Sequence, residues 1–383
     1  MRFSTFILRN VLRRPARSVL TMIGMSLAVG AVVAFVGIAD GLSSSMLELY
    51  QRRGVHLVVT RSDSVNPLSS TIDDRIGSEI AKVEGVKAVC PGLVDVLSFE
   101  NLGLNNVVTQ GWLPDAFMFD ELELLEGRGL SEASRGQKEI MLGKDLAANA
   151  DLKVGAAVTL VGEDFKVAGI YQTFAGLENN MVIMLLEDAQ RLTGKRGQIT
   201  GCTVRIVDAT PERIEEVKAV IQGEVAAKLN LQKKIKAAEP SDMLKTNTQI
   251  KMVKAAALLI SVVGLLISGI LVLTVMLMSV FERTREIGIL RAIGWRPGRV
   301  IRMILMESVL LSLAGAVVGS LGALGLVWAL SRLPQVNGAI PATASPQIIL
   351  TGFLIALFVG LIGAAYPAYR GARLLPTEAL RHE

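Results

Sequence analysis

The stretch AAALLISVVGLLISGILVLTVMLMSVF, residues 255–281, decides the architecture of this chain because it contains no Asp, Glu, Lys or Arg. The hydrocarbon core of a bilayer is about 30 Å thick, and an α-helix needs about 20 apolar residues to cross it. An uncharged run of this length predicts a transmembrane helix rather than the buried helix of a soluble protein.

Three further uncharged runs, at 18–39, 308–331 and 347–369, predict three more membrane helices. Prolines such as Pro334 break the helical path between the last two runs and predict a short turn there. The chain is 51% hydrophobic with a mean hydropathy of +0.47, and these runs hold much of that apolar content. A cleaved signal peptide is an alternative for the first run, but signal peptides have shorter apolar cores, which favours a retained helix.

The arginines predict the orientation of the chain, because cytoplasmic loops of membrane proteins carry an excess of basic residues. Many arginines precede the first run or lie between the second and third runs, whereas Arg332 stands alone between the third and fourth. The two basic groups are Arg2, Arg9, Arg13, Arg14 and Arg17, and Arg283, Arg285, Arg291, Arg296, Arg299 and Arg302. Both termini and the second loop are therefore expected in the cytoplasm.

The predicted order of segments follows from these crossings. It comprises a cytoplasmic interfacial helix at 1–17, membrane helix 1 at 18–39, an extracytoplasmic domain at 40–239, a stalk with membrane helix 2 at 240–281, a cytoplasmic coupling loop at 282–302, membrane helix 3 at 303–331, a short external loop at 332–346, membrane helix 4 at 347–369 and a cytoplasmic tail at 370–383. The fold class is thus an α-helical membrane protein with a large mixed α+β domain inserted between helices 1 and 2.

The inserted domain has ordinary globular patterning. Strands are predicted at 55–60, 158–161, 166–170 and 203–207, and amphipathic helices at 73–83 and 211–221. Thr210 is expected to cap the second helix, with Pro211 in its first turn. The domain is expected to end near Glu239, with Ser241 or Asp242 capping a returning helix that forms a paired stalk with the first membrane helix.

Two cysteines, Cys90 and Cys202, fall in this domain, where a disulfide would persist if the compartment is oxidising. Nothing in their spacing requires one, and two buried free thiols are the favoured alternative. The net charge of +5 is explained by membrane orientation, so no nucleic-acid partner is expected.

The sequence contains none of the common motifs for nucleotide binding, catalysis or metal binding. No G-x-x-x-x-G-K-[ST] motif for nucleotide phosphates occurs, and the two histidines, His56 and His382, fall on opposite sides of the predicted membrane. No Cys/His cluster has the spacing of a metal site. The sequence therefore predicts no catalytic site, no metal and no cofactor in this chain.

No ionisable residue lies near the centre of a predicted membrane helix, and Glu307, at the cytoplasmic start of the third helix, comes closest. Interfacial anchoring or pairing is favoured over a proton-carrying role, because a charge near mid-bilayer is costly. Glycines in the second and third helices permit close helix packing, either within the chain or in a dimer. They are Gly264, Gly269, Gly315, Gly319 and Gly322.

The segment ERTREIGILRAIG, residues 282–294, is followed by WRPG, residues 295–298, where glycine and proline can stop a helix. The sequence therefore predicts a short cytoplasmic helix with a sharp stop. Charges occur all round this helix, so a cleft in a partner protein suits it better than a lipid surface. The segment, together with MESVLLSLAGAVVG at 306–319 and YPAYRGARLLPTEALR at 366–381, resembles the FtsX-like/MacB-like ABC transporter permease family. In the outer domain, LEGRGL at 125–130, KEIMLG at 138–143 and LKVG at 152–155 resemble the family's periplasmic core.

This resemblance implies roles for individual residues. The surface that docks on an ATPase would comprise Glu282, Arg283, Arg285, Glu286, Ile287, Gly288, Leu290, Arg291, Ala292 and Gly294. The cytoplasmic tail motif would comprise Tyr366, Pro367, Arg370, Ala372, Arg373, Pro376, Ala379, Leu380 and Arg381. Trp295 and Pro297 depart from the small or polar residues expected after Gly294, which leaves the exit of the helix undefined.

The resemblance also implies a place in the cell (inner) membrane and a function. The chain would be the membrane-spanning permease subunit that transmits the motion of a separate cytoplasmic ABC ATPase to the outer domain, for export or extraction of an amphiphile, lipoprotein or peptide. ATP and Mg²⁺ would bind the ATPase, and the partners would be a second permease copy or paralogue, a periplasmic adaptor or outer-membrane channel, and the lipid bilayer. The alternatives are an FtsX-like transmitter that regulates an outside hydrolase or sensor, and a membrane-anchored sensory or structural domain without an ATPase.

Overall fold

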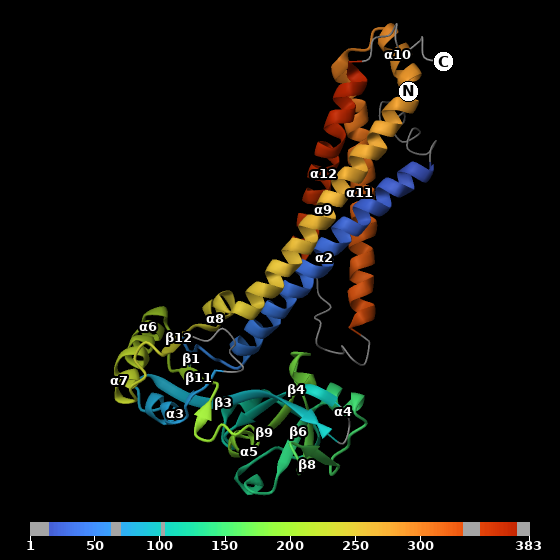
Figure 1. Cartoon of the computed structure of the whole chain (residues 1–383). Helices are drawn as coiled ribbons and strands as arrows, with labels where there is room; N and C mark the ends of the chain where they lie inside the picture. The colour runs from blue at the N-terminus through green and yellow to red at the C-terminus, as the bar shows by residue number, and fades with distance from the viewer. Residues whose placement is uncertain (1–14, 63–69, 101–103, 332–344, 374–383) are drawn as a thin grey trace. The chain divides into compact units, whose positions relative to one another are not determined.

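The computed structural model describes residues 15–62, 70–100, 104–331 and 345–373, and the chain divides into two compact units. A helical unit comprises Met1–Gly41, Val253–Ala329 and Ala342–Glu383, and an α/β unit comprises Leu42–Met252 with Leu330–Pro341 (Figure 1). The interfacial helix predicted at 1–17 falls almost entirely outside the described residues. The same holds for most of the loop predicted at 332–346 and for residues 374–383 of the tail predicted at 370–383.

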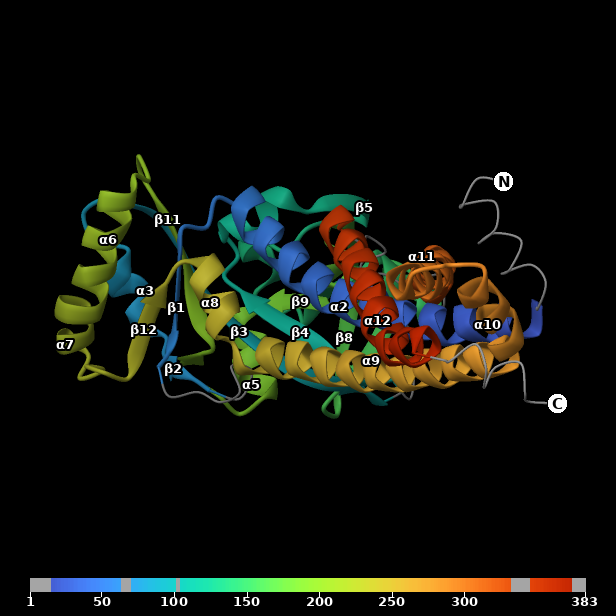
Figure 2. The ribbon, with the colours of Figure 1, turned by 90° about the horizontal axis from the view of Figure 1, so that it is seen from above.

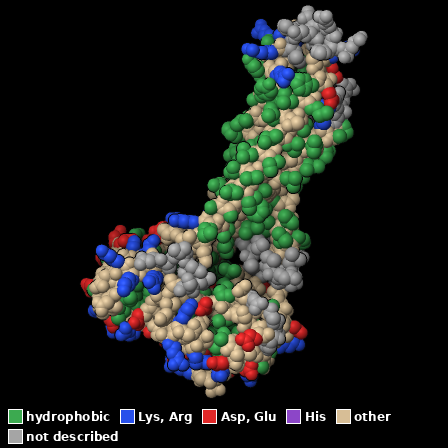
Figure 3. All heavy atoms as spheres, viewed as in Figure 1, with side chains coloured by type: hydrophobic (Ala, Val, Ile, Leu, Met, Phe, Trp, Pro, Cys, Tyr) green, Lys and Arg blue, Asp and Glu red, His purple; other side chains and the backbone are tan. Residues whose placement is uncertain are grey.

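Among the residues that the structure describes, four helices are long and apolar enough to cross a membrane, and they coincide with the four uncharged runs. They are α2 (Pro15–Arg52), α9 (Thr248–Glu282), α11 (Pro297–Leu330) and α12 (Pro346–Ala372). The short helix α10 (Thr284–Ala292) lies between α9 and α11. Exposed hydrophobic side chains cover the visible face of the helical unit, and Lys and Arg side chains gather at the end that carries α10 (Figure 3). The prediction of four apolar helices is confirmed.

Close backbone contacts hold α11 against α2. A Cβ atom added to Gly319 would lie 2.3 Å from the carbonyl oxygen of Ser26, and one added to Gly315 would lie 2.9 Å from that of Met22. Since only glycine allows this approach, these two glycines serve packing within the chain. Gly322, by contrast, faces open space.

The α/β unit contains a ten-stranded mixed sheet with the main order β12-β1-β11-β3-β4-β9-β6-β8-β5, and β7 pairs with β3 and β8. The strands are β1 (Leu57–Arg61), β3 (Val86–Phe99), β4 (Leu104–Trp112), β5 (Glu123–Gly127), β6 (Glu139–Gly143), β7 (Ala157–Leu160), β8 (Glu163–Gln172), β9 (Val182–Leu185), β11 (Gly201–Ile206) and β12 (Ile235–Ala238), with β2 (Ile72–Asp73) and β10 (Gln198–Ile199) forming a separate pair. The strands β4 and β9 run parallel, as do β6 and β8.

Short helices flank this sheet at two separate places. Figures 1 and 2 both place α3, α6 and α7 beside β1, β11 and β12, and α5 beside β3, β4 and β9. The α-helices are α3 (Arg75–Ile80), α4 (Lys144–Asn149), α5 (Leu186–Leu192), α6 (Pro211–Val220), α7 (Ala226–Lys228) and α8 (Pro240–Thr246). The 3₁₀ turns are η2 (Phe117–Glu121), η3 (Glu132–Ser134) and η4 (Glu178–Asn180), and η5 (Ile221–Val225) is a π-helical turn that joins α6 to α7.

The sheet has two apolar faces with different neighbours. Alternate residues of the strands, such as Leu57 and Val59 of β1, fill the larger core with α3 and α6. The opposite face packs Val58 with Trp112 and Tyr171, and Tyr50 of α2 and Met243 of α8 contact this second core. The period-two pattern of the strands thus separates the two cores, as expected for a sheet covered on both sides.

The predicted strands match β1, β7, β8 and β11, and the predicted helices match α3 and α6 to within a few residues. Thr210 caps α6, because its hydroxyl oxygen accepts a hydrogen bond from the Arg213 N–H at 3.3 Å. The cap predicted at Ser241 or Asp242 is wrong. Glu239 occupies that position, because Pro240, whose fixed φ suits the first helical residue, starts α8 one residue earlier.

The continuous stalk helix predicted from residue 240 is also wrong. The chain is extended at Asn247 (φ −61°, ψ 120°), which ends α8. The Asn247 side chain then accepts hydrogen bonds from the N–H groups of Gln249 (2.9 Å) and Ile250 (3.2 Å), as an N-cap does, and starts α9. The other predicted stalk helix is unbroken, since α2 continues to Arg52.

The two cysteines are free thiols, as favoured from the sequence. Cys90 lies opposite Thr203, while Cys202 lies opposite Pro91, so the two side chains belong to opposite cores of the sheet. Burial raises the pKa of the Cys90 thiol to about 12, and it raises the pKa of Cys202 as well.

Candidate ATPase-docking and coupling site

The short helix α10 ends in a well-defined turn. Gly294 adopts φ +102°, the Gly294 N–H donates to the Arg291 carbonyl at 3.1 Å, and the Trp295 N–H donates to the Leu290 carbonyl at 3.0 Å. This pair of bonds is the Schellman motif, which satisfies the last carbonyl groups of a helix. Pro297 then begins α11, so the unusual residues after Gly294 do define the exit of the helix.

The inner side of α10 is anchored in the helical unit. Ile287 is 2% exposed and belongs to an apolar cluster with Val280 of α9 and Val300 of α11, and Ala368 of α12 joins the same cluster. Gly288 is buried as well. These two residues were predicted for the docking surface, but their burial places them against the chain's own helices.

The outer side of α10 presents a mixed charged and apolar surface. Ile289 is 42% exposed and Ile293 is 74% exposed, and neither was named among the predicted docking residues. Of the predicted residues, Glu282, Arg285, Glu286, Ala292 and Gly294 are exposed, and Leu290 and Arg291 are half-buried. We call Arg285, Glu286, Ile289, Ala292 and Ile293 the outer face of α10.

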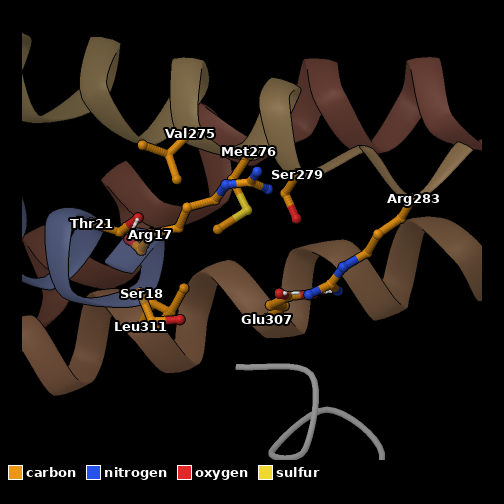
Figure 4. Close-up of a pocket in the computed structure, with 9 residues that line it drawn as sticks. All are labelled: Arg17, Ser18, Thr21, Val275, Met276, Ser279, Arg283, Glu307 and Leu311. Atoms are coloured by element: carbon orange, nitrogen blue, oxygen red, sulfur yellow. Dashed lines mark hydrogen bonds and ion pairs between the residues drawn. The ribbon is translucent and has the colours of Figure 1, made fainter. Parts of the chain in front are cut away.

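Arg283 does not belong to this face. Its Nη1 atom lies 3.1 Å from Glu307 Oε2 and 3.3 Å from Glu307 Oε1, and both side chains are only 9% exposed. Figure 4 shows the Arg283 side chain reaching from the end of α9 to Glu307 on α11. The guanidinium therefore ties the start of α10 to α11, and Glu307 is paired, the kind of role favoured for it from the sequence.

A second ion pair lies beside the first. Arg17 of α2 pairs with Glu282 at the end of α9, and its guanidinium lies near Met276 and Ser279 in Figure 4. A small cavity of about 10 Å³ separates these groups, which is room for about one water molecule. The cavity is lined by Arg17, Ser18, Thr21, Val275, Met276, Ser279, Arg283, Glu307 and Leu311. The four charges link α2, α9 and α11 at the base of α10.

Arg17 was recognised from the sequence only as a signal for membrane orientation. Its partner Glu282 is 265 positions away in the chain, and no local pattern joins the two residues. The one available signal was its place at the edge of an uncharged run, where a basic side chain meets the bilayer interface.

The tail motif continues the packing at this end of the unit. Pro367 is buried within α12, whereas Tyr366 is exposed. The Arg370 guanidinium lies 4.8 Å from the ring centroid of Phe281, and that of Arg373 lies 4.5 Å from the ring of Tyr369. The remaining tail residues, Pro376, Ala379, Leu380 and Arg381, fall outside the described residues.

Among the residues that the structure describes, no group of three His, Cys, Asp or Glu side chains has the geometry to hold a metal ion. The site instead combines an exposed helix face with a buried, charge-paired base. The inner side of α10 contacts α9, α11 and α12 through apolar side chains, and the end of α9 contacts α2 through the pair of Arg17 and Glu282.

Two family models match this chain. The model of the MacB-like periplasmic core domain matches residues 18–224, and that of the FtsX-like permease C-terminal matches residues 258–376. The crystal structure of the periplasmic region of MacB from Actinobacillus actinomycetemcomitans aligns with a TM-score of 0.42 and 16% identity, over 53% of this chain and 97% of that one.

Curated relatives match over nearly the whole chain. A protein named uncharacterized ABC transporter permease YknZ, from Bacillus subtilis, is 26% identical over 398 residues and 98% of both chains. The macrolide export ATP-binding/permease protein MacB of Hahella chejuensis is 28% identical over 395 residues, which are 96% of this chain and 58% of that longer protein. Because the first family model alone matches more than half of the sequence, the chain belongs to the ABC transporter permeases that combine a MacB-like periplasmic core domain with an FtsX-like permease domain.

Proposed function

We propose that this permease binds a separate cytoplasmic ABC ATPase on the outer face of α10 and passes nucleotide-driven motion through its membrane helices to the α/β unit. This motion would export or extract an amphiphile, a lipoprotein or a peptide. The ATPase would bind ATP and Mg²⁺, a second permease copy or paralogue would complete a dimer, and a periplasmic adaptor or outer-membrane channel would receive the substrate.

The observation that carries this proposal is the division of α10 into an anchored side and an exposed side. Ile289 and Ile293 expose apolar surface beside Arg285 and Glu286, and this combination suits the cleft of a protein partner. The inner residue Ile287 packs α10 against α9, α11 and α12, so a movement of the ATPase bound to the outer face would displace these membrane helices.

The charge distribution supports a cytoplasmic position for α10. Exposed arginines cluster on α10, on the start of α11 and on the end of α12, among them Arg285, Arg302 and Arg370. By the positive-inside rule this end would face the cytoplasm, with both termini there and the α/β unit outside. A maleimide that does not cross membranes should then label a cysteine at Lys166 in intact cells and leave one at Ile293 unlabelled.

Co-purification of the ATPase tests the docking face directly. Glu286→Lys and Ile293→Asp should each abolish recovery of an ABC ATPase with the tagged chain, because each places an unfavourable charge in the contact. Glu212→Lys, the same charge reversal on the exposed start of α6, is the matched control and should leave recovery unchanged. Normal recovery with both α10 variants would overturn the docking role.

A transmitter that regulates an outside hydrolase or sensor is the second candidate, and the polar cavity gives one reason to keep it. At about 10 Å³ that cavity holds no amphiphile or peptide, so any substrate would be handled elsewhere than at this site. Recovery of the ATPase together with an adaptor or outer-membrane channel would support export. Recovery with an envelope hydrolase or sensor would support the transmitter.

A further inference from the structure

The last turn of α2 is capped where it enters the α/β unit. Gly54 adopts φ +58°, its N–H donates to the Gln51 carbonyl at 3.0 Å, and the Val55 N–H donates to the Tyr50 carbonyl at 2.9 Å. This is again a Schellman motif, and its glycine lets the chain turn sharply into β1. A turn of this kind fixes the local backbone. A short connection through glycine alone, however, does little to keep the 38-residue helix α2 from changing its angle to β1.

A buried ion pair adds a second attachment at the same point. Arg53, the residue after α2, donates from Nη1 to Glu178 Oε1 at 2.8 Å and from Nη2 to Glu178 Oε2 at 2.7 Å. The side chains of Arg53 and Glu178 are 1% and 6% exposed. The planar guanidinium engages both carboxylate oxygens, so the contact fixes orientation as well as distance.

The Arg53 side chain is held on other sides too. Its guanidinium lies 5.5 Å from the ring centroid of Trp112, and the Arg53 carbonyl accepts a hydrogen bond from Arg205 Nε at 2.8 Å. The neighbouring Arg52 lies 4.1 Å from the ring of Phe174. The end of α2 therefore meets several elements of the unit, with the ion pair at their centre.

Glu178 stands on a rigid support. It begins the 3₁₀ turn η4, which connects β8 to β9, and its carbonyl accepts a hydrogen bond from the hydroxyl of buried Tyr171 at 2.8 Å. The next residue, Asn179, bonds both the N–H (2.7 Å) and the carbonyl (3.0 Å) of Thr173 through its side chain. The carboxylate thus moves with β8 and β9 rather than with a loose loop.

The two attachments of α2 reach different parts of the sheet. The chain itself enters β1, near one end of the strand order, whereas β9 and β8 follow four and six places further along. Two separate attachments, the chain connection to β1 and the ion pair with Glu178, fix the direction of α2 relative to the sheet. The chain connection alone would allow the helix to change that direction. Removal of the ion pair leaves the chain connection and weaker contacts to hold the angle of α2.

Stability alone is a poor explanation for such a pair. Replacement of a buried ion pair by apolar residues of similar size is often neutral or stabilising, and the apolar core around Trp112 and Tyr171 offers such an environment. What an apolar pair does not supply is the fixed geometry of two parallel hydrogen bonds.

We propose that Arg53 and Glu178 are positioning residues that lock the angle between α2 and the sheet, so that displacement of α2 moves the α/β unit instead of bending the chain at Gly54. This inference rests on the proposed function, since it identifies the joint through which the motion would pass. The ion pair carries the proposal because it is buried, engages both carboxylate oxygens, and joins the end of α2 to the turn between β8 and β9, which are remote from β1 in the sheet.

Distances between spin labels on the full-length chain in nanodiscs test the joint without any ATPase. Cysteines at Ser44 and Lys166, both exposed, report the position of α2 against β8, and cysteines at Lys166 and exposed Glu212 report the integrity of the α/β unit. Ser44 lies nine residues before Arg53, or about 14 Å along the helix, so a swing of 20° moves it by about 5 Å. The buried native thiols should remain unlabelled.

The double variant Arg53→Met with Glu178→Leu should broaden the 44–166 distance distribution by about 5 Å and leave the 166–212 distribution unchanged. A matched control replaces another two-oxygen ion pair of the same unit, Arg128 with Glu139, by the same residue types. This control should leave the 44–166 distribution unchanged. If the double variant changes the 166–212 distance, the isosteric variant Glu178→Gln is used in its place. This variant should broaden the 44–166 distribution by about half as much. An unchanged 44–166 distribution in a variant with an intact 166–212 distance would overturn the proposal.

A separate measurement tells failure of the joint from failure of the proposed function. Labels at Lys166 and at exposed Leu321 on α11 follow the α/β unit against the helical unit, in the presence of the co-purified ATPase and ATP. The native chain should show an ATP-dependent change, and the double variant should show less than half of it at an unchanged ATPase rate. No change in the native chain would refute the proposed function, while equal changes in native and variant chains would refute the joint.

Discussion

The buried pair of Arg283 and Glu307 gives a quantitative test of how the helical unit holds the base of α10. Glu307→Gln keeps the shape of the side chain and removes its charge, so the guanidinium of Arg283 stays buried without a counter-ion. Removal of one partner from a buried ion pair costs about 3–5 kcal/mol of unfolding free energy. Both side chains retain 9% exposure and border a cavity of water size, so we expect the lower limit, about 3 kcal/mol.

An exposed pair in the same unit is the matched control. Asp40 of α2 and Lys254 of α9 lie 2.8 Å apart, with side-chain exposures of 50% and 46%. Exposed pairs contribute about 0.2–1 kcal/mol. Asp40→Asn should therefore lower the free energy of unfolding by at most about a third as much as Glu307→Gln.

The assay follows unfolding of the full chain in mixed detergent micelles with a rising fraction of dodecyl sulfate. Trp295 packs against the apolar cluster around α10, so its fluorescence reports this region once Trp112 and Trp328 are replaced by Phe. The double variant Arg283→Gln with Glu307→Gln should recover at least half of the loss, because it leaves no unpaired charge. Equal losses for Glu307→Gln and Asp40→Asn, or no recovery in the double variant, would refute the reasoning.

Three further predictions concern packing, protonation and thiol chemistry. Gly319→Val should lower the free energy of unfolding in mixed micelles by about 3 kcal/mol, because an added Cβ meets the Ser26 carbonyl at 2.3 Å and overpacking forces the helices apart. His56 Nδ1 accepts a hydrogen bond from the Ile206 N–H, and burial, followed by the nearby Arg205 charge, lowers the pKa of His56. The folded chain therefore binds the proton more weakly than the unfolded chain does. The local stability measured by hydrogen exchange should fall as the pH drops below about 6.5. Cys90, whose pKa is raised to about 12, should react with maleimide at pH 7.5 less than about a tenth as fast as an exposed cysteine introduced elsewhere.

Each of these predictions has a direct control. Gly322→Val, at a site where an added Cβ meets open space, should have a small effect, and equal losses at the two glycines would contradict the packing argument. His56→Gln removes the titrating group and should flatten the pH dependence; an unchanged slope would show that another group titrates. Cys90 should react fully once the chain is unfolded, and rapid labelling of the native chain would contradict its burial.

The sequence predicted the membrane helices and several strands because these rest on local, repeating signals. A run without charge must lie in lipid or in a core, and 255–281 is too long for most cores. The alternation in 203–207 reports one buried face of β11 in the same way. Such signals need no knowledge of which residues meet in space.

The predictions failed where a choice depended on distant partners or on a single turn. Arg283 was expected on the docking surface because the resemblance carried its position over, and only its contact with Glu307 on α11 turns it inward. Ile293 was left out because it was not among the positions that the resemblance carried over, and only the structure shows how far its side chain is exposed. The break at Asn247 was missed because its side-chain cap becomes visible only when the chain on both sides is placed.

The position of β1 in the sheet has a consequence for the order of events during biosynthesis. Leu57 of β1 pairs with Val204 of β11, and Val58 of β1 pairs with Ala238 of β12. The strand β1 is synthesised first, so both of its edges stay unpaired until β11 and β12 have been synthesised. At about 5–20 residues per second this wait is roughly 7–35 s, while β4, β6, β8 and β9 already have one another to pair with. Through this interval the newborn strand LVVTR presents two open edges, and a chaperone that shields it would protect the nascent chain from aggregation.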